Sequence, residues 1–218
     1  MRYTSVKYDT NKYNFKQIVT DLFSTDLAIL HESSKDKYEE LFKVGADSST
    51  IFHKMFYEKY RSGWSKLEET YFNFIKEVIF PDYSEDILYQ KFPTFRVHLP
   101  RNIAVGAFHR DFDFHHPIGE INYVLPLTDS EDTASIWVES ECGKKDFEAM
   151  SMKSDSFILF HGNQLEHGNK VNETEFTRVS MDFRVLPISF YREDAGDEGS
   201  MTLNTKFKEG QYYRLMKK

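Results

Sequence analysis

The chain has 218 residues, a formal net charge of −7, and 40% hydrophobic and 16% aromatic residues. This length suits one domain, and the hydrophobic content excludes a disordered chain. The acidic balance argues against a dedicated nucleic-acid binder, which would usually be basic. We therefore expect a single folded domain over residues 1–218 that has no nucleic-acid partner.

Cysteine content and hydropathy indicate the cellular compartment of the protein. Its one cysteine, Cys142, excludes an intramolecular disulfide, which fits a reducing compartment. No apolar run approaches the roughly 18 residues that a membrane helix needs. Residues 1–8 lack the apolar stretch of a secretory signal. The sequence predicts a cytoplasmic protein without a membrane partner and leaves the oligomeric state open, a dimer being one option.

Residues 1–91 are expected to be mostly helical. After an extended lead-in, apolar residues recur from Phe15 to Phe23 at the i, i+3, i+4 and i+7 positions of one helix face. Further on, Ser65 and Glu68 match the capping-box pattern at the start of another helix. The other elements expected here are a short strand over residues 28–30 and helices over residues 35–43 and 51–56.

The hydrophobic period changes near residue 92, where proline and glycine begin to separate short runs of β-branched and aromatic residues. This spacing is typical of an all-β sandwich, jelly roll or barrel. We predict a mainly β protein with N-terminal helices (α+β), in which residues 1–91 pack on a core over 92–187 and residues 188–218 form an extension or lid. The expected strands cover residues 94–99, 104–111, 120–126, 134–139, 155–160, 167–171 and 176–186.

The last of these strands alternates between polar and apolar residues. Arg178, Ser180, Asp182 and Arg184 share one face, and apolar residues occupy the other. If helices cover the apolar face, the polar face lines an internal pocket.

The stretch over residues 108–116 carries the first candidate metal ligands. His109 and Asp111 stand two apart, so on a strand they would point to the same face. A third ligand is expected at His167, and two histidines with one carboxylate form the facial triad of non-haem Fe(II) oxygenases. Two alternatives stay open: His161 in place of His167, and Asp113 in place of Asp111.

The residues after His167 suit an anionic cosubstrate. Three protein ligands on one face of an octahedral metal leave positions for a chelating 2-oxo acid and for O2. Arg178, eleven residues past His167, would hold the far carboxylate of that acid, with Ser180 beside it. Asn122 is a further candidate for the cosubstrate. Candidates for the pocket or the substrate are Arg96, Trp137, His115 and Arg184.

Several runs of the β half resemble Fe(II)/2-oxoglutarate-dependent oxygenases of the streptomycin-biosynthesis StrG-like group. They are residues 108–111, 117–128, 136–140, 167–172 and 177–185. This resemblance, which covers residues 92–187, implies a double-stranded β-helix (a cupin-like jelly roll), iron on His109, Asp111 and His167, and 2-oxoglutarate on Arg178. Related halogenases usually lack the carboxylate, so Asp111 implies hydroxylation or another outcome of hydrogen abstraction.

These observations together predict an Fe(II)- and 2-oxoglutarate-dependent dioxygenase, a biosynthetic oxidoreductase that uses O2. It would hydroxylate, or otherwise oxidise by hydrogen abstraction, a sugar- or amino-acid-derived small molecule and release succinate and CO2. The alternative is a non-oxidative cupin-like isomerase or a small-molecule binding or sensing module. The pair Arg178 and Ser180 discriminates between the two, because a simple cupin has no need of it.

Overall fold

The computed structural model describes residues 2–33, 50–104, 107–192, 199–200 and 205–218. The helix expected over residues 35–43 and most of the acidic loop before residue 200 lie outside these ranges. Within them, no helix combines the length and the apolar character that crossing a lipid bilayer requires.

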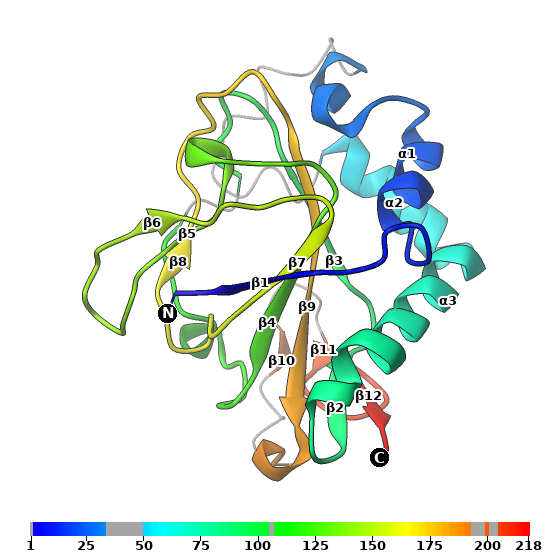
Figure 1. Ribbon diagram of the computed structural model, residues 1–218, viewed down its shortest axis with the longest axis vertical. Helices are drawn as coiled ribbons and strands as arrows, with labels where there is room; N and C mark the ends of the chain where they lie inside the picture. Colours follow the sequence, from blue (N-terminus) through cyan, green and yellow to red (C-terminus); the bar gives the residue numbers. More distant parts are fainter. Residues whose placement is uncertain (1, 34–49, 105–106, 193–198, 201–204) are drawn as a thin grey trace.

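A seven-stranded antiparallel sheet forms the centre of the described structure (Figure 1). Its longest strand, β9 (Arg178–Pro187), pairs with β4 on one side and with both β2 and β3 on the other. The order is β1-β7-β4-β9-β2-β12, with β3 beside the first half of β9. The other strands are β1 (Thr4–Lys7), β2 (Ile87–Gln90), β3 (Thr94–His98), β4 (Ile121–Pro126), β7 (Ser156–Phe160) and β12 (Tyr213–Met216).

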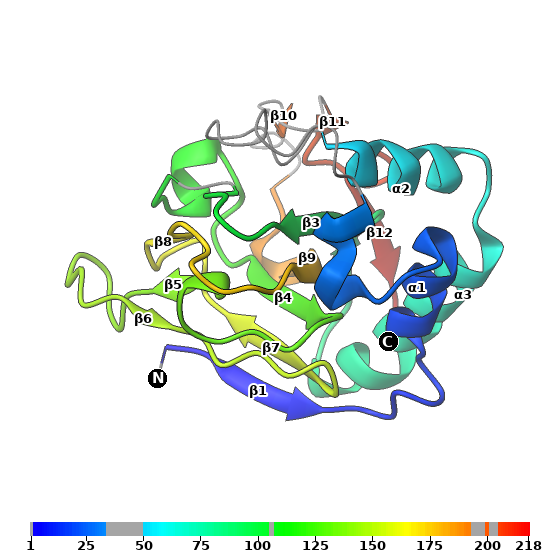
Figure 2. The same cartoon turned by 90° about the horizontal axis from the view of Figure 1, so that it is seen from above.

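A smaller sheet lies on the side of the large sheet away from the helices, as Figures 1 and 2 both show. It has the order β6-β5-β8 and is antiparallel. Its strands are β5 (Trp137–Val138), β6 (Glu148–Ala149) and β8 (His167–Gly168), and a separate pair joins β10 (Gly199–Ser200) to β11 (Thr205–Lys206). The described structure is thus mostly antiparallel β with few helices.

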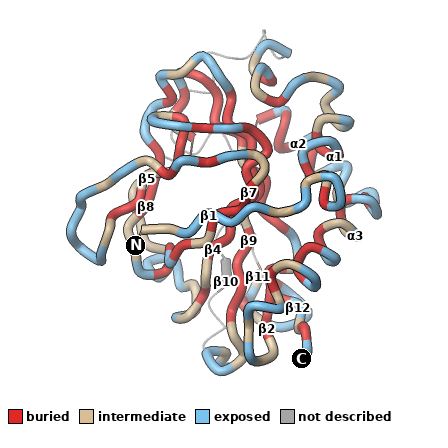
Figure 3. The backbone as a smooth tube through the Cα atoms, in the orientation of Figure 1, coloured by how far each residue is buried: buried red, intermediate tan, exposed pale blue. Residues whose placement is uncertain are grey.

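Three α-helices cover one face of the large sheet: α1 (Phe15–Phe23), α2 (Ile51–Arg61) and α3 (Ser65–Phe74). A π-helical turn (Ile75–Ile79) and a 3-10 turn (Phe80–Asp82) continue α3. The apolar stripes of these helices form one buried cluster with Val179, Met181, Phe183 and Val185 of β9. The polar residues of β9 therefore point to the other face, because side chains alternate along a strand. Figure 3 shows how completely β9 is buried.

Four of the predicted strands were wrong in whole or in part. The strand expected over 167–171 shortens to β8, which covers His167–Gly168. Residues 27–33 form a 3-10 turn instead of a strand at 28–30, because the Asp26 side chain accepts a hydrogen bond from the Ala28 amide at 2.9 Å. In the run 104–111, the described residues 104 and 107–111 do not form a strand: Ala104 has a left-handed φ of 53°, and a 3-10 helix begins at Asp111. The strand expected over 134–139 shortens to β5 because a 3-10 turn occupies Asp132–Ala134.

The segment that follows Asp111 is tied to the C-terminal strand by a buried carboxylate. Glu120 is 1% exposed, and it accepts hydrogen bonds from His116 Nδ1 at 2.6 Å and from the Tyr213 hydroxyl. The His116 ring also packs on Phe207, with ring centroids 4.4 Å apart. Burying a carboxylate is costly unless it is hydrogen-bonded. The loop that carries Asp111 is therefore anchored to residues far away in the sequence.

Candidate metal centre

Two histidines from distant parts of the chain meet through their backbones. His109 and His167 form an antiparallel bridge in which each amide donates to the other residue's carbonyl at 2.9 Å. Paired residues of a bridge carry their side chains to the same side, and the two imidazole rings have centroids 4.7 Å apart. The bridge brings into direct contact two residues that 57 residues of chain separate.

Asp111 completes a group that could hold a metal ion. Its Oδ1 lies 3.4 Å from His109 Nε2 and 3.7 Å from His167 Nε2. One ligand atom from each of the three residues lies within 4.8 Å of the other two. Their spacing had suggested that His109 and Asp111 share one face of a strand, and this prediction was wrong. A turn brings them together: Asp111 opens the 3-10 helix Asp111–Phe114, and its amide donates to the Gly162 carbonyl at 2.9 Å.

The two residues that the sequence left as alternatives lie outside this group. His161 is exposed. Asp113 is paired with Arg110 at 2.7 Å on the protein surface. Among the described residues, the group that can bind a metal therefore contains His167 and Asp111 rather than these two.

A hydrogen bond at Nδ1 of each histidine ring leaves Nε2 as the nitrogen that faces Asp111. His109 Nδ1 donates to the Ala107 carbonyl at 2.8 Å, and His167 Nδ1 donates to the Leu165 carbonyl at 3.0 Å. A carbonyl only accepts, so the proton of each neutral ring lies on Nδ1. The lone pair of each Nε2 then points toward Asp111. This is the tautomer that a metal-binding histidine needs.

The second oxygen of Asp111 is held by three donor groups. Oδ2 accepts from Asn122 Nδ2 at 2.7 Å and from Nε of Arg184 at 3.0 Å, and Arg184 Nη2 also lies 3.0 Å away. Oδ1 is thereby left facing the two imidazoles. Asn122 comes from β4 and Arg184 from β9, and these two residues are direct partners in the sheet. The sheet itself therefore sets the orientation of this carboxylate.

Charge and burial give Asp111 and His167 the protonation state that a metal ligand needs. Burial would raise the pKa of Asp111, but Arg184 and His109 outweigh it and hold that pKa well below its usual range. Burial lowers the pKa of His167 to about 4. Burial also lowers the pKa of His109, but its hydrogen bond with Asp111 produces a net rise. Near neutral pH the carboxylate is ionised and His167 is neutral, as metal binding requires.

A pocket opens beside the three residues, and most of the predicted site residues line it. Arg178, 3% exposed, lines it, and its Nη1 donates to Asn169 Oδ1 at 3.0 Å. Val124, Ile136 and Phe160 supply the apolar part of the wall. The lining residues are Arg96, His109, Asn122, Val124, Ile136, Phe160, His167, Gly168, Asn169, Arg178, Ser180, Asp182 and Arg184. The alternation along β9 thus directs its four polar residues into one pocket.

Two of the sequence candidates lie elsewhere. Trp137 does not line this pocket: Lys170 Nζ lies 3.2 Å from its ring centroid, and its Nε1 donates to the Asp132 carbonyl. His115 has a left-handed φ of 67° and lines a separate surface pocket with Phe112 and Phe190.

Sequence reasoning missed Asn169 and Gly162. Asn169 stands two residues past His167, which was a signal that it shares the same side of the chain. Gly162 gave no such signal. Its importance comes from a close approach: a Cβ built there would lie 2.8 Å from Asn122 Nδ2.

Comparisons with known proteins identify a relative over nearly the whole chain. The streptomycin biosynthesis protein StrG of Streptomyces griseus is 33% identical over 213 residues, which cover 97% of this chain and 98% of the relative. Among solved structures, apo EctD from S. alaskensis aligns with a TM-score of 0.49, 14% identity, 90% of this chain and 77% of its own. The nickel complex of the non-heme monooxygenase ThoJ aligns with a TM-score of 0.46, 8% identity, 84% of this chain and 73% of its own. No family model matches the chain.

The fold and the site together define a mostly antiparallel β protein that carries a metal-binding group of two histidines and one carboxylate. The chain belongs to the family of the streptomycin biosynthesis protein StrG. This assignment rests on the StrG relative, because the identity extends over nearly the whole of both chains.

Proposed function

We propose that the protein is an Fe(II)- and 2-oxoglutarate-dependent oxygenase that hydroxylates, or otherwise oxidises by hydrogen abstraction, a small molecule. Succinate and CO2 are its other products. The observation that carries this proposal is that His109 and His167, which form one group with Asp111, line the same pocket as Arg178. We also propose that the two sheets form a double-stranded β-helix within a single domain over residues 1–218.

The donor set fits Fe(II). Two imidazole nitrogens and one carboxylate oxygen are ligand types that Fe(II) accepts, and they leave coordination positions open. Nε2 of His109, Nε2 of His167 and Oδ1 of Asp111 are the atoms that would hold the ion, because hydrogen bonds already engage the other nitrogen or oxygen of each residue. When bound, the metal and 2-oxoglutarate supply the oxidising chemistry, while the protein positions the groups.

Arg178 and Ser180 would hold the distal carboxylate of 2-oxoglutarate. Both side chains are buried and line the pocket from consecutive inward positions of β9. A hydrogen bond to a charged group contributes about 1.5–3 kcal/mol. Asn169 holds the Arg178 guanidinium from the other side, at 3.0 Å.

A visible spectrum under nitrogen tests the proposal. Fe(II) and 2-oxoglutarate together should produce a weak charge-transfer band that neither component gives alone. The band should disappear in His167→Ala and persist in His161→Ala, since His161 is exposed and lies outside the metal group. In air, Asp111→Ala should lose succinate production, and the surface variant Asp113→Ala should retain it.

Three results would count against this function. A band that survives in His167→Ala would remove that residue from the ligand set, and full succinate production by Asp111→Ala would remove the carboxylate. A wild-type protein that binds the metal but gives no band with 2-oxoglutarate would favour a cupin-like isomerase or binding module.

A further inference from the structure

The pocket contains an arginine that neither the metal group nor the proposed cosubstrate site uses. Arg96 lies on β3, opposite Ser180 of β9 in the sheet register. Its Nε donates to Asp182 Oδ1 at 2.8 Å. Within the described part of the chain, Nη1 and Nη2 of Arg96 have no hydrogen-bond partner. The side chain is 27% exposed and lines the pocket. One edge of its guanidinium is thus anchored, and the other is available to a ligand.

The partner of Arg96 is shared, so it does not neutralise that arginine. Asp182 Oδ1 accepts from Arg96, and its Oδ2 accepts from Arg184 Nη1 at 3.1 Å. Arg184 in turn is paired with Asp111 at 3.0 Å. Counting Asp111 with the charged residues of the pocket wall, three arginines (Arg96, Arg178 and Arg184) face two carboxylates (Asp111 and Asp182), an excess of one positive charge.

The proposed cofactors do not remove this excess. A divalent metal adds two positive charges and 2-oxoglutarate adds two negative ones, so their sum is zero. The assembled site keeps one positive charge in a partly buried pocket, where an unpaired charge is costly. A substrate with one negative charge would balance it.

We propose that Arg96 binds a single carboxylate of the primary substrate through Nη1 and Nη2. This inference rests on the proposed function, because the charge balance includes the metal and 2-oxoglutarate. A guanidinium edge with two parallel donors matches a carboxylate in geometry as well as charge. The apolar wall of Val124, Ile136 and Phe160 lies in the same pocket, so the substrate class is a small carboxylic acid with an apolar part.

Butyrate is a suitable probe, because it has one carboxylate and a short apolar chain. The protein is first saturated with Ni(II), which does not turn over, and with 2-oxoglutarate. Butyrate, neutral butyramide and inorganic phosphate are then titrated in by calorimetry. We expect butyrate to bind, butyramide not to bind, and phosphate to bind more weakly than butyrate because it carries more than one negative charge.

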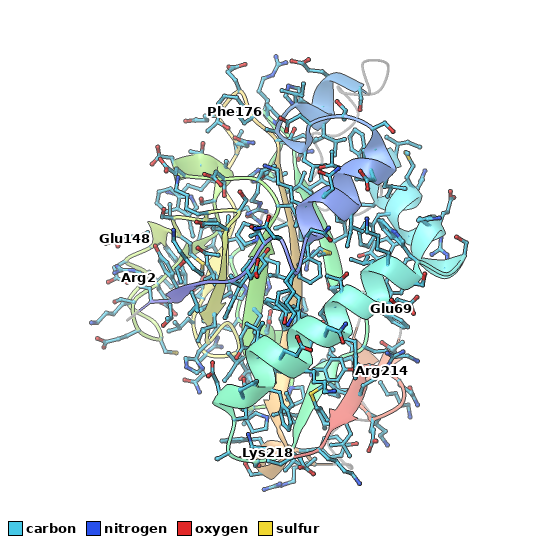
Figure 4. The ribbon with its side chains drawn as sticks, turned by 45° about the vertical axis from the view of Figure 1, so that its right-hand side comes forward. Arg2, Glu69, Glu148, Phe176, Arg214 and Lys218 are labelled. Carbon is cyan, nitrogen blue, oxygen red and sulfur yellow. The ribbon has the colours of Figure 1, made fainter. Side chains whose placement is uncertain are left out.

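The variant Arg96→Gln should weaken butyrate binding by about tenfold or more, as expected for the loss of a charge-assisted hydrogen bond. Arg96→Lys, which keeps the charge, should recover part of the affinity. The matched control is Arg2→Gln. Arg2 is also a partly exposed arginine, with 21% of its side chain accessible, and it is ion-paired with Asp146 and Glu148, on the side of the molecule away from the helices (Figure 4).

Each other outcome overturns the proposal in a different way. Unchanged butyrate binding in Arg96→Gln would show that the anion binds elsewhere. A loss of 2-oxoglutarate affinity equal to the loss of butyrate affinity would assign Arg96 to the cosubstrate. Tighter binding of phosphate than of butyrate would show that Arg96 prefers a phosphate monoester to a carboxylate as the anionic group of the substrate. Failure of the wild-type protein to bind 2-oxoglutarate with Ni(II) would refute the proposed function itself and remove the charge balance with it.

Discussion

Arg184 holds Asp111 from the side opposite the two histidines, with Nε and Nη2 each 3.0 Å from Oδ2. The pair is buried, since Asp111 is 2% and Arg184 8% exposed. Groups that orient a metal ligand commonly contribute 10- to 100-fold to metal affinity. These contacts suit a residue that positions the metal group. The sequence had offered Arg184 as a candidate for the pocket or the substrate, and it also lines the pocket.

Replacement of Arg184 should weaken metal binding. We expect Arg184→Gln to raise the dissociation constant for Mn(II) or Co(II) by about 10- to 100-fold, because Asp111 loses the partner that orients it. Calorimetry on the metal-free protein measures this. Arg214→Gln, at an exposed position of β12 (Figure 4), is the control and should bind the metal as the wild type does. Equal affinities in all three proteins would mean that Asp111 needs no such support.

Replacement of Arg178 should weaken the binding of 2-oxoglutarate rather than that of the metal. We expect Arg178→Gln to raise the 2-oxoglutarate dissociation constant by about tenfold or more and to leave the Mn(II) affinity close to that of the wild type. The reason is that Arg178 donates to Asn169 and lines the pocket, whereas the group that could hold the metal consists of His109, Asp111 and His167. Titration of 2-oxoglutarate into the Ni(II)-loaded protein is the measurement. A parallel loss of metal affinity would place Arg178 among the residues that support the metal.

Gly162 should be intolerant of a methyl group because of Asn122. A Cβ there would lie 2.8–2.9 Å from three atoms of the Asn122 amide, which itself holds Asp111 at 2.7 Å. We expect Gly162→Ala to lower metal affinity by displacing that amide. In an Asn122→Ala background the same substitution should cost much less, since the obstructing group is gone. Strictly additive effects of the two changes on the dissociation constant would contradict this coupling.

Acid should destabilise the metal-free protein between pH 6.5 and about 4. Burial lowers the pKa of His53 and of His98 to about 3 and that of His167 to about 4, from 6.5 in the unfolded chain. As the pH falls through this range, the unfolded state takes up protons that the folded state does not. The free energy of unfolding then decreases by up to about 1.4 kcal/mol per pH unit for each histidine.

Denaturant titrations across this range measure that slope. His53→Gln should reduce it by up to about 1.4 kcal/mol per pH unit, since one buried ring no longer titrates. Gln164→Asn, at an exposed position without a titratable group, should leave the slope unchanged. A stability that does not depend on pH between 6.5 and 4 would show that these rings are not held neutral in the folded state.

The sequence by itself determined which residues this site brings together. Periodicity located four of the seven strands of the large sheet, β3, β4, β7 and β9, but not β1, β2 or β12. The alternation along Arg178–Pro187 placed four polar residues on one face, because a strand's side chains alternate whatever it pairs with. Residue type and order also singled out His109, Asp111 and His167. Local patterns of this kind need no knowledge of distant contacts. Even so, the local geometry assigned to His109 and Asp111 was wrong, since a turn rather than a strand joins them.

Only the tertiary structure decided how these residues act on one another. The bridge between His109 and His167, the anchoring of Asp111 by Asn122 and Arg184, and the removal of Trp137 from the pocket all depend on which strands become neighbours. Strand pairing is a long-range choice that no single run of residues encodes. The arrangement around Arg96 also depends on strand pairing, because Asp182 accepts hydrogen bonds from both Arg96 and Arg184.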